Sequence, residues 1–167
     1  MASALLYSKG AHIAKEITLY RFRQPRDSIG VMYETFDHTA DLGLRIRAAD
    51  LDTLFAEAAR ALFATLVENL DAVAPNQRLD VTISGSDREY LLFDWLKELL
   101  YRFDAEHLLL SRFEVHVAAD GLQGSAWGEP LDPRRHELAH EVKAITYHAL
   151  RVEETPDGWL AEVIVDI

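Results

Sequence analysis

The sequence contains no cysteine, no long apolar run and few basic residues, and each of these absences excludes a class of protein. Without cysteine among 167 residues, the chain has no disulfides, thiolate zinc sites or cysteine nucleophiles. No apolar stretch approaches the roughly 20 residues that a membrane-spanning helix needs, so we expect a cytoplasmic protein that does not span a membrane. The hydrophobic fraction of 49% is still ordinary for a globular domain with its own core.

The shortage of basic residues is uneven along the chain. There are 17 Lys and Arg against 28 Asp and Glu, which gives a formal net charge of -11. Residues 1–30 hold five of the basic residues and two of the acidic ones, so residues 31–167 carry a net charge of -14. A body this acidic repels phosphate backbones, because affinity for nucleic acid depends largely on Lys and Arg. We therefore expect any role near RNA to run through a basic protein partner.

Residues 1–31 differ in pattern from the rest of the chain. They show no sustained strand alternation, only a weak helical pattern, and no apolar core of a secretory signal. Met32 stands directly before the first convincing strand. We therefore predict an N-terminal extension over residues 1–31, either mobile or an artefact of the assigned start, and one domain over residues 32–167.

Two helices and several strands are predicted within this domain. Alternation at Leu42, Leu44 and Ile46 indicates a half-buried strand. Apolar residues at three- and four-residue spacing predict helices over 51–68, capped by Asp50, and over 87–106, where Ser86 and Glu89 resemble a capping box. Further strands are expected over 32–37, 79–83, 113–117, 122–126, 142–151 and 159–167. The pattern favours an α+β domain with two amphipathic helices packed on a mostly antiparallel or mixed sheet.

One catalytic motif occurs in an unsuitable context. His136, Glu137 and His140 match the H-E-x-x-H pattern, in which two histidines one helical turn apart hold zinc and the glutamate acts as base. Pro133 lies just upstream, and the chain beyond His140 reads as strand rather than helix. A zinc hydrolase is therefore a weak alternative, and two solvated histidines in a loop or a short helix are the simpler interpretation.

A pair of aspartates at opposite ends of the domain offers a different site. Asp41 lies close to Asp37 and His38, while Asp166 interrupts the apolar run Val163–Ile167, where aspartate is disfavoured. If the last strand runs beside the first, both carboxylates meet the terminal carboxylate of Ile167. Hard oxygen ligands select calcium, magnesium or manganese, and His38 leaves zinc open. The structural alternative is a turn residue at Asp41 and a solvent-facing Asp166.

Around these residues the chain resembles the archease family, from Tyr33 to Ile167. The resemblance is carried by ordered motifs at matching spacing rather than by one short pattern. These motifs are Phe36–Asp41 with Leu42–Leu44, Trp127–Glu129, Glu141–His148, Gly158–Trp159 and Val165–Ile167. The extension at residues 1–31 and the H-E-x-x-H match depart from the family pattern.

This resemblance implies a non-catalytic activator of an RtcB-type RNA ligase, which seals RNA ends in tRNA splicing and RNA repair. The activator promotes guanylylation and multiple turnover of the ligase and meets RNA only through it. The family pattern places a divalent ion, usually calcium, at Asp41, Asp166 and Ile167. It also makes Lys143 a candidate functional residue, with His38 nearby. A generic metal-binding or chaperone-like module is the remaining alternative.

Overall fold

The structure is a computed structural model that describes residues 32–38 and 41–167. The extension predicted over residues 1–31 lies outside this part of the chain, as do Thr39 and Ala40. In chain order the elements are β1 (Met32–His38), β2 (Asp41–Ala48), α1 (Leu51–Leu66), the 3-10 helix η1 (Leu70–Ala72), β3 (Gln77–Ser84), α2 (Arg88–Glu106), β4 (Leu108–Ala118), β5 (Gly121–Pro130), β6 (Ala144–Thr155) and β7 (Gly158–Asp166).

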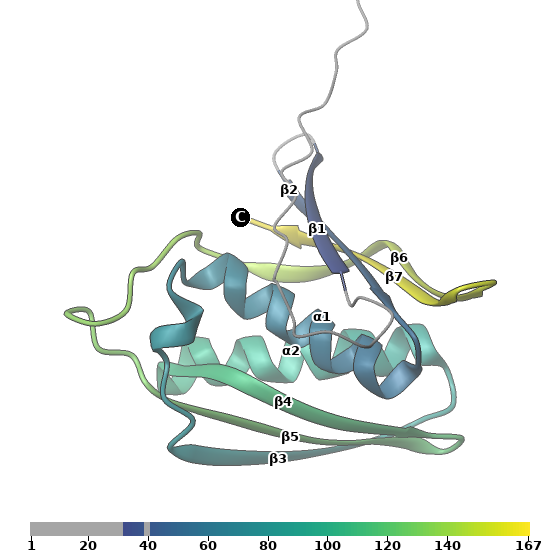
Figure 1. Ribbon diagram of the computed structural model, residues 1–167, viewed down its shortest axis with the longest axis horizontal. Coiled ribbons are helices and arrows are strands. Elements are labelled where there is room, and N and C mark those ends of the chain that lie inside the picture. Colours follow the sequence, from purple (N-terminus) through teal and green to yellow (C-terminus); the bar gives the residue numbers. More distant parts are fainter. Residues whose placement is uncertain (1–31, 39–40) are drawn as a thin grey trace, which may run out of the picture.

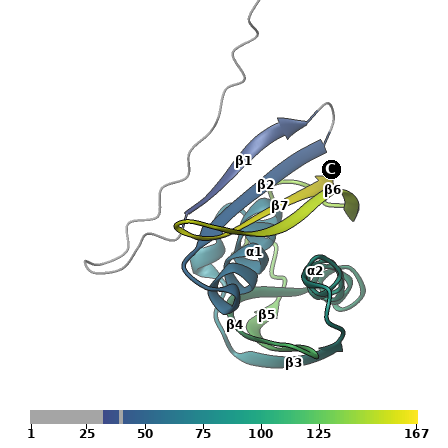
Figure 2. The same ribbon diagram turned by 90° about the vertical axis from the view of Figure 1, so that its right-hand side faces the viewer.

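Two antiparallel sheets enclose the two helices between them (Figures 1 and 2). One sheet has four strands in the order β1-β2-β7-β6, and the other has three in the order β3-β5-β4. The predicted α+β class is therefore confirmed. The division into two sheets was not predicted, because alternation shows which residues a strand buries but not which strand lies beside it. Within residues 32–38 and 41–167, no helix is long and apolar enough to cross a membrane.

Local capping explains where both helices begin. The Asp50 carboxylate accepts a hydrogen bond from the Thr53 amide at 2.8 Å, as predicted for α1. At the start of α2 the capping box was wrong, because the cap is Asp87 rather than Ser86. The Asp87 Oδ1 accepts from the amides of Glu89 and Tyr90 at 2.9 and 3.1 Å.

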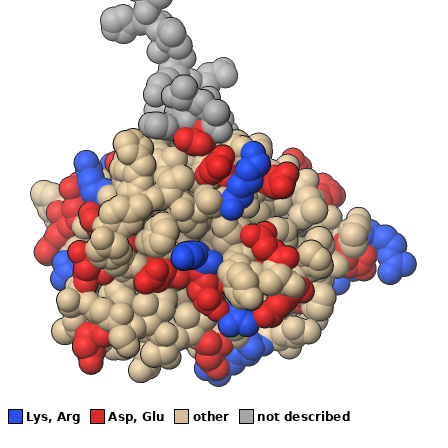
Figure 3. Space-filling view, turned by 180° about the vertical axis from the view of Figure 1, so that it is seen from behind, with Lys and Arg blue, Asp and Glu red and all other residues tan. Residues whose placement is uncertain are grey.

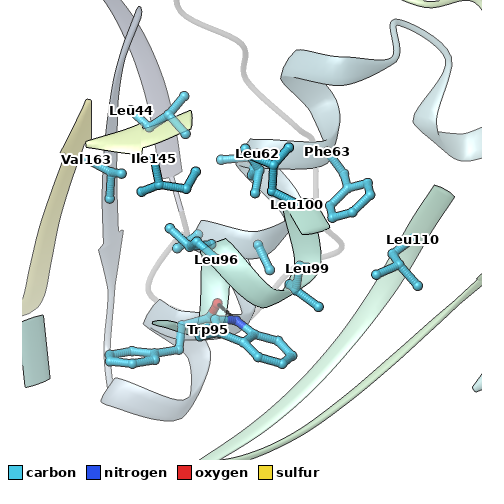
Figure 4. Packing of buried hydrophobic residues seen from close by; sticks show 14 of the residues in the cluster. Leu44, Leu62, Phe63, Trp95, Leu96, Leu99, Leu100, Leu110, Ile145 and Val163 are labelled. Carbon is cyan, nitrogen blue, oxygen red and sulfur yellow. Dashed lines mark hydrogen bonds between the residues drawn. The ribbon is translucent and has the colours of Figure 1, made fainter. Parts of the chain in front are cut away.

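The centre of the core lies in the helical layer (Figure 4). Trp95 of α2 is fully buried, and its indole Nε1 donates to the Phe55 carbonyl of α1 at 3.1 Å. That hydrogen bond satisfies the polar atom of the largest buried side chain and ties the helices together. Gly124 of β5 lies against the ring, and a Cβ there would come within 2.5 Å of it. The three-stranded sheet therefore packs closely on Trp95.

The four-stranded sheet has an inner and an outer face. Leu44 and Ile46 of β2 are fully buried on the helix side, opposite Val163 and Ala161 of β7. Because side chains alternate along a strand, Asp41 at the start of β2 lies on the outer face. The face with the predicted site residues is thus fixed by the same pattern that fixes the core.

Candidate metal centre

The backbone register of the four-stranded sheet pairs the two predicted aspartates. Asp41 of β2 lies directly opposite Asp166 of β7, in an unbroken antiparallel register over the whole of β2. Side chains at directly opposite positions have Cβ atoms about 4.5–5.5 Å apart and share one face. The expectation that residues 41 and 166 meet is therefore fulfilled, although they are 125 positions apart in the sequence.

A third strand completes this end of the sheet. Ala144 of β6 pairs with Asp166 on the other side of β7. Just before it, the Lys143 amide donates to the Asp166 carbonyl at 2.8 Å, and the Lys143 ammonium donates to the main-chain oxygen of Ile167 at 3.0 Å. One lysine therefore holds the last two residues by its main chain and by its side chain.

We name this end of the sheet the acidic tip and define it as Asp41, Asp166, Ile167 and Lys143. Both carboxylates are half-buried, and Ile167 packs partly against the core. The His38 backbone pairs with Asp41, which places this residue beside the tip, but its side chain and that of Asp37 lie outside the described part of the structure. Like charges directly opposite each other on a sheet are destabilising. A cation at the tip would relieve that repulsion.

The chemistry of the tip fits a hard divalent cation. Two carboxylates and a main-chain oxygen are the ligand types that calcium, magnesium and manganese prefer. Across residues 32–38 and 41–167, no group of three or more His, Asp or Glu side chains converges on one point. A complete set of ligands would therefore need the Ile167 oxygen, together with solvent or a partner molecule. The Lys143 ammonium lies at that same oxygen and supplies positive charge there.

The packing of Phe36 explains why residue 43 of the motif that follows Asp41 is a glycine. Gly43 lies two residues beyond Asp41 and opposite Phe36 of β1. The Phe36 ring covers this position so closely that any Cβ on residue 43 would collide with it. The Arg45 guanidinium then lies 5.1 Å from the centre of the same ring. The Phe36 ring thus packs directly against Gly43, and this contact fixes the end of β1 that leads towards Asp41.

The zinc-hydrolase alternative is not supported by the structure. His136, Glu137 and His140 lie in a non-helical segment, so the one-turn spacing of two zinc ligands is absent. His136 is 3% exposed, its Nδ1 accepts from the Asp132 amide at 3.0 Å, and its Nε2 lies 3.1 Å from Glu129. The simpler interpretation, two solvated histidines, is also wrong for His136, although His140 is exposed.

Sequence reasoning missed the role of Glu129, which anchors the long loop before β6. Its carboxylate is 7% exposed and accepts from the Ala74 amide at 2.8 Å and from both terminal nitrogens of Arg135 at 2.8 and 3.0 Å. The hydrogen bonds from Arg135 and Ala74, with a smaller contribution from His136, lower the Glu129 pKa to about 2. A charged residue within the Trp127–Glu129 motif was the available signal.

The fold and the acidic tip thus define a class of α+β protein with an oxygen-rich candidate cation site at one end of a sheet. The sequence model of the Archease protein family matches residues 33–167. The chain therefore belongs to the archease family.

Known relatives agree with this assignment. The chain is 41% identical to protein archease of Pyrococcus furiosus over 140 residues, covering 81% of this chain and 98% of that one. It is 42% identical to protein archease of Methanopyrus kandleri over 139 residues, with 81% and 99% covered. The solution structure of Methanobacterium thermoautotrophicum protein 1598 is similar, with a TM-score of 0.72, 37% identity, and 81% and 98% of the two chains covered.

Proposed function

We propose that this protein is a non-catalytic activator of an RtcB-type RNA ligase. In this role it promotes guanylylation of the ligase, so that the ligase turns over many times in tRNA splicing or RNA repair in the cytoplasm. Membership of the archease family supports the choice of partner. The observation that carries the proposal is the register that sets Asp41 opposite Asp166, with Lys143 bonded to Ile167 beside them.

Asp41, Asp166 and the Ile167 oxygen would hold a divalent cation, which we propose to be calcium, with magnesium or manganese as chemically similar substitutes. When bound, this cation supplies positive charge at an otherwise acidic end of the molecule. The two aspartates orient it, and the sheet register holds them in place. Lys143 adds a second positive charge at the same end and can neutralise nucleotide phosphate charge in the ligase active site.

The charge balance favours action on a protein rather than on RNA. Residues 31–167 carry a net charge of -14, which repels a phosphate backbone but attracts the basic surface that an RNA ligase needs for its own substrate. The acidic tip can therefore approach such a surface without competing as a second RNA. RNA is thus bound only by the ligase in this proposal.

A ligation assay with limiting RtcB-type ligase tests the proposal. The assay contains GTP, a divalent cation, and RNA pieces that end in a 2′,3′-cyclic phosphate and a 5′-hydroxyl. We expect the ligase alone to stop after about one product per molecule, and addition of this protein to give continued turnover with faster ligase guanylylation. Unchanged turnover at saturating protein would overturn the proposal and favour the generic metal-binding module. Product formed without any ligase would show that the protein is itself catalytic.

A further inference from the structure

Two tyrosines stack on the surface where α2 meets β6. Tyr90 is 56% exposed and Tyr147 is 43% exposed, and their ring centres are 4.9 Å apart with an interplanar angle of 23°. Phe93 contacts Tyr147 edge-on, with ring centres 5.8 Å apart. Aromatic side chains are enriched at protein interfaces, because a rigid ring offers contact area at little entropic penalty. We name Tyr90, Phe93 and Tyr147 the tyrosine patch.

One member of the patch, Tyr147, lies on an irregular edge strand. β6 is the last strand of its sheet, and its register with β7 breaks between Thr146 and Arg151. Inside the break, Ala149 has a φ of 56°, a left-handed conformation that disfavours any residue with a Cβ. Bulges blunt open edges and redirect side chains. Protection of the edge accounts for the bulge, but not for a large exposed ring that stacks on α2.

Two carboxylates immediately flank the patch at the start of α2, where Asp87 Oδ1 caps the helix and Glu89 Oε1 accepts from the Val152 amide at 3.4 Å. Desolvation and a hydrogen bond with Tyr90, reinforced by the charges of Tyr90, Asp87 and Glu89, raise the Tyr147 pKa to about 12. The hydroxyl therefore stays protonated in the physiological range. Figure 3 shows the side of the molecule with α2 and β6, where acidic atoms cover more surface than basic ones. A guanidinium stacked on the rings would find two carboxylates nearby.

The tyrosine patch is also close to the acidic tip. Tyr147 lies three residues beyond Ala144, which pairs directly with Asp166. At the usual rise along a strand, this separation is about 10 Å. Because side chains alternate along β6, Tyr147 points to the helix side of the sheet and Asp166 to its outer face. A partner that wraps round the β6 edge reaches both, within the roughly 800 Å² that a standard interface buries on each partner.

We propose that the tyrosine patch, with Asp87 and Glu89, binds an arginine-bearing basic segment of the partner protein. The inference rests on the proposed function in one respect, namely that this partner is the ligase. It adds a contact that needs no divalent cation and is separate from the acidic tip. The acidic charge of the domain disfavours single-stranded RNA, whose bases also stack on aromatic rings.

The first test compares a double variant with a matched control. Tyr90→Ala with Tyr147→Ala removes the stacked pair, whereas Tyr101→Ala removes a tyrosine that is 57% exposed on the same helix, about 16 Å further along its axis. We expect the double variant to bind the ligase roughly tenfold or more weakly and the control to bind normally. Calcium binding without ligase should be unchanged in both variants, and circular dichroism checks their fold. Equal ligase affinity of the double variant and wild type would overturn the inference.

A second test does not depend on the ligase. Wild-type protein is titrated with an oligoarginine peptide while the ring proton signals of the tyrosines are followed by NMR. We expect the signals of Tyr90 and Tyr147 to shift and those of Tyr101 to stay, and Glu89→Gln should weaken the effect. No selective shift, or tighter binding of a single-stranded RNA at the same rings, would overturn the inference. If the wild type fails to bind the ligase at all, the proposed function fails, and this titration alone decides about the patch.

Discussion

Two rows of side chains on the outer face of the four-stranded sheet differ in how they arrange charge. In one row, Arg45 binds Glu34 at 2.8 Å and Glu162 at 2.6 Å, so opposite charges alternate across three strands. In the other row, about 13 Å away along β2, two aspartates face each other across β2 and β7. The first row is neutralised within the sheet once Arg151 of β6 is counted, because its Nε lies 4.0 Å from Glu162 Oε2. A cation would relieve the repulsion in the second, which is why we propose the second as the functional row.

The largest effect should come from changing an aspartate of the acidic tip. Asp166→Asn removes one carboxylate, so we expect multiple turnover of the ligase to fall by roughly tenfold or more and stabilisation by calcium to disappear. Without divalent cations, the variant should be as stable as wild type or more stable, by up to about 1 kcal/mol, because the like-charge repulsion is gone. Ligation assays and thermal melts with and without calcium measure both effects.

The matched control for Asp166→Asn is Glu162→Gln, in the neutralised row of the same strand. It should reduce stability by weakening a pair with Arg45, yet leave ligase activation intact. If Glu162→Gln abolished activation and Asp166→Asn did not, the functional row would be misassigned.

Removal of the buried carboxylate of Glu129, which lies outside both rows, should have the next largest effect. Glu129 has a pKa of about 2, against an ordinary value of 4.5, so its contribution to stability is complete above about pH 5 and is lost as the pH falls from 4.5 towards 2. That contribution is at most on the order of 3 kcal/mol. Urea unfolding of wild type and Glu129→Gln should show a difference that shrinks over this range of pH. A difference that stays constant with pH would contradict the assigned pKa.

A substitution at Gly43, which lies on β2 between the two rows, should have a smaller effect. Gly43→Ala places a methyl group against the Phe36 ring, so β1 must shift, and overpacking of this kind costs about 1–3 kcal/mol. We also expect weaker calcium binding, because β1 leads towards Asp41. Adding Phe36→Ala to Gly43→Ala should recover part of both losses. Absence of any recovery would show that the ring does not cause the defect.

The smallest effect should come from the neutralised row itself. Arg45→Met leaves Glu34 and Glu162 without their shared guanidinium, and we expect a loss of about 1 kcal/mol in the free energy of unfolding, since the group is 31% exposed. Activation of the ligase should be retained. Chemical denaturation and the ligation assay separate the two outcomes, and lost activation would remove the contrast between the rows.

The comparison also shows what the sequence could predict. Leu42, Leu44 and Ile46 alternate, and this pattern alone puts Asp41 on the outer face, while an aspartate within an apolar strand drew attention to residue 166. The two helices were predicted to within two residues of their observed ends because their apolar spacing is regular. Such features depend on local periodicity, which can be read directly from the order of residues in the sequence.

Other features depend on contacts between distant residues, which periodicity does not display. The separation into two sheets follows from pairing choices, such as β5 between β3 and β4. The role of Glu129 depends on Ala74, some 55 residues earlier, and on Arg135 in a later loop. His136 was interpreted as a solvated histidine, because its burial against that carboxylate cannot be deduced from its neighbours in the sequence.

The indole of Trp95 is a built-in optical label for the middle layer of the fold. It is fully buried and bonded to the other helix, whereas Trp127 and Trp159 are half-buried and lie under arginine side chains. Blue-shifted emission that resists acrylamide quenching should therefore come from Trp95 alone. Stopped-flow refolding followed at that wavelength would time the docking of the two helices separately from events at either outer surface.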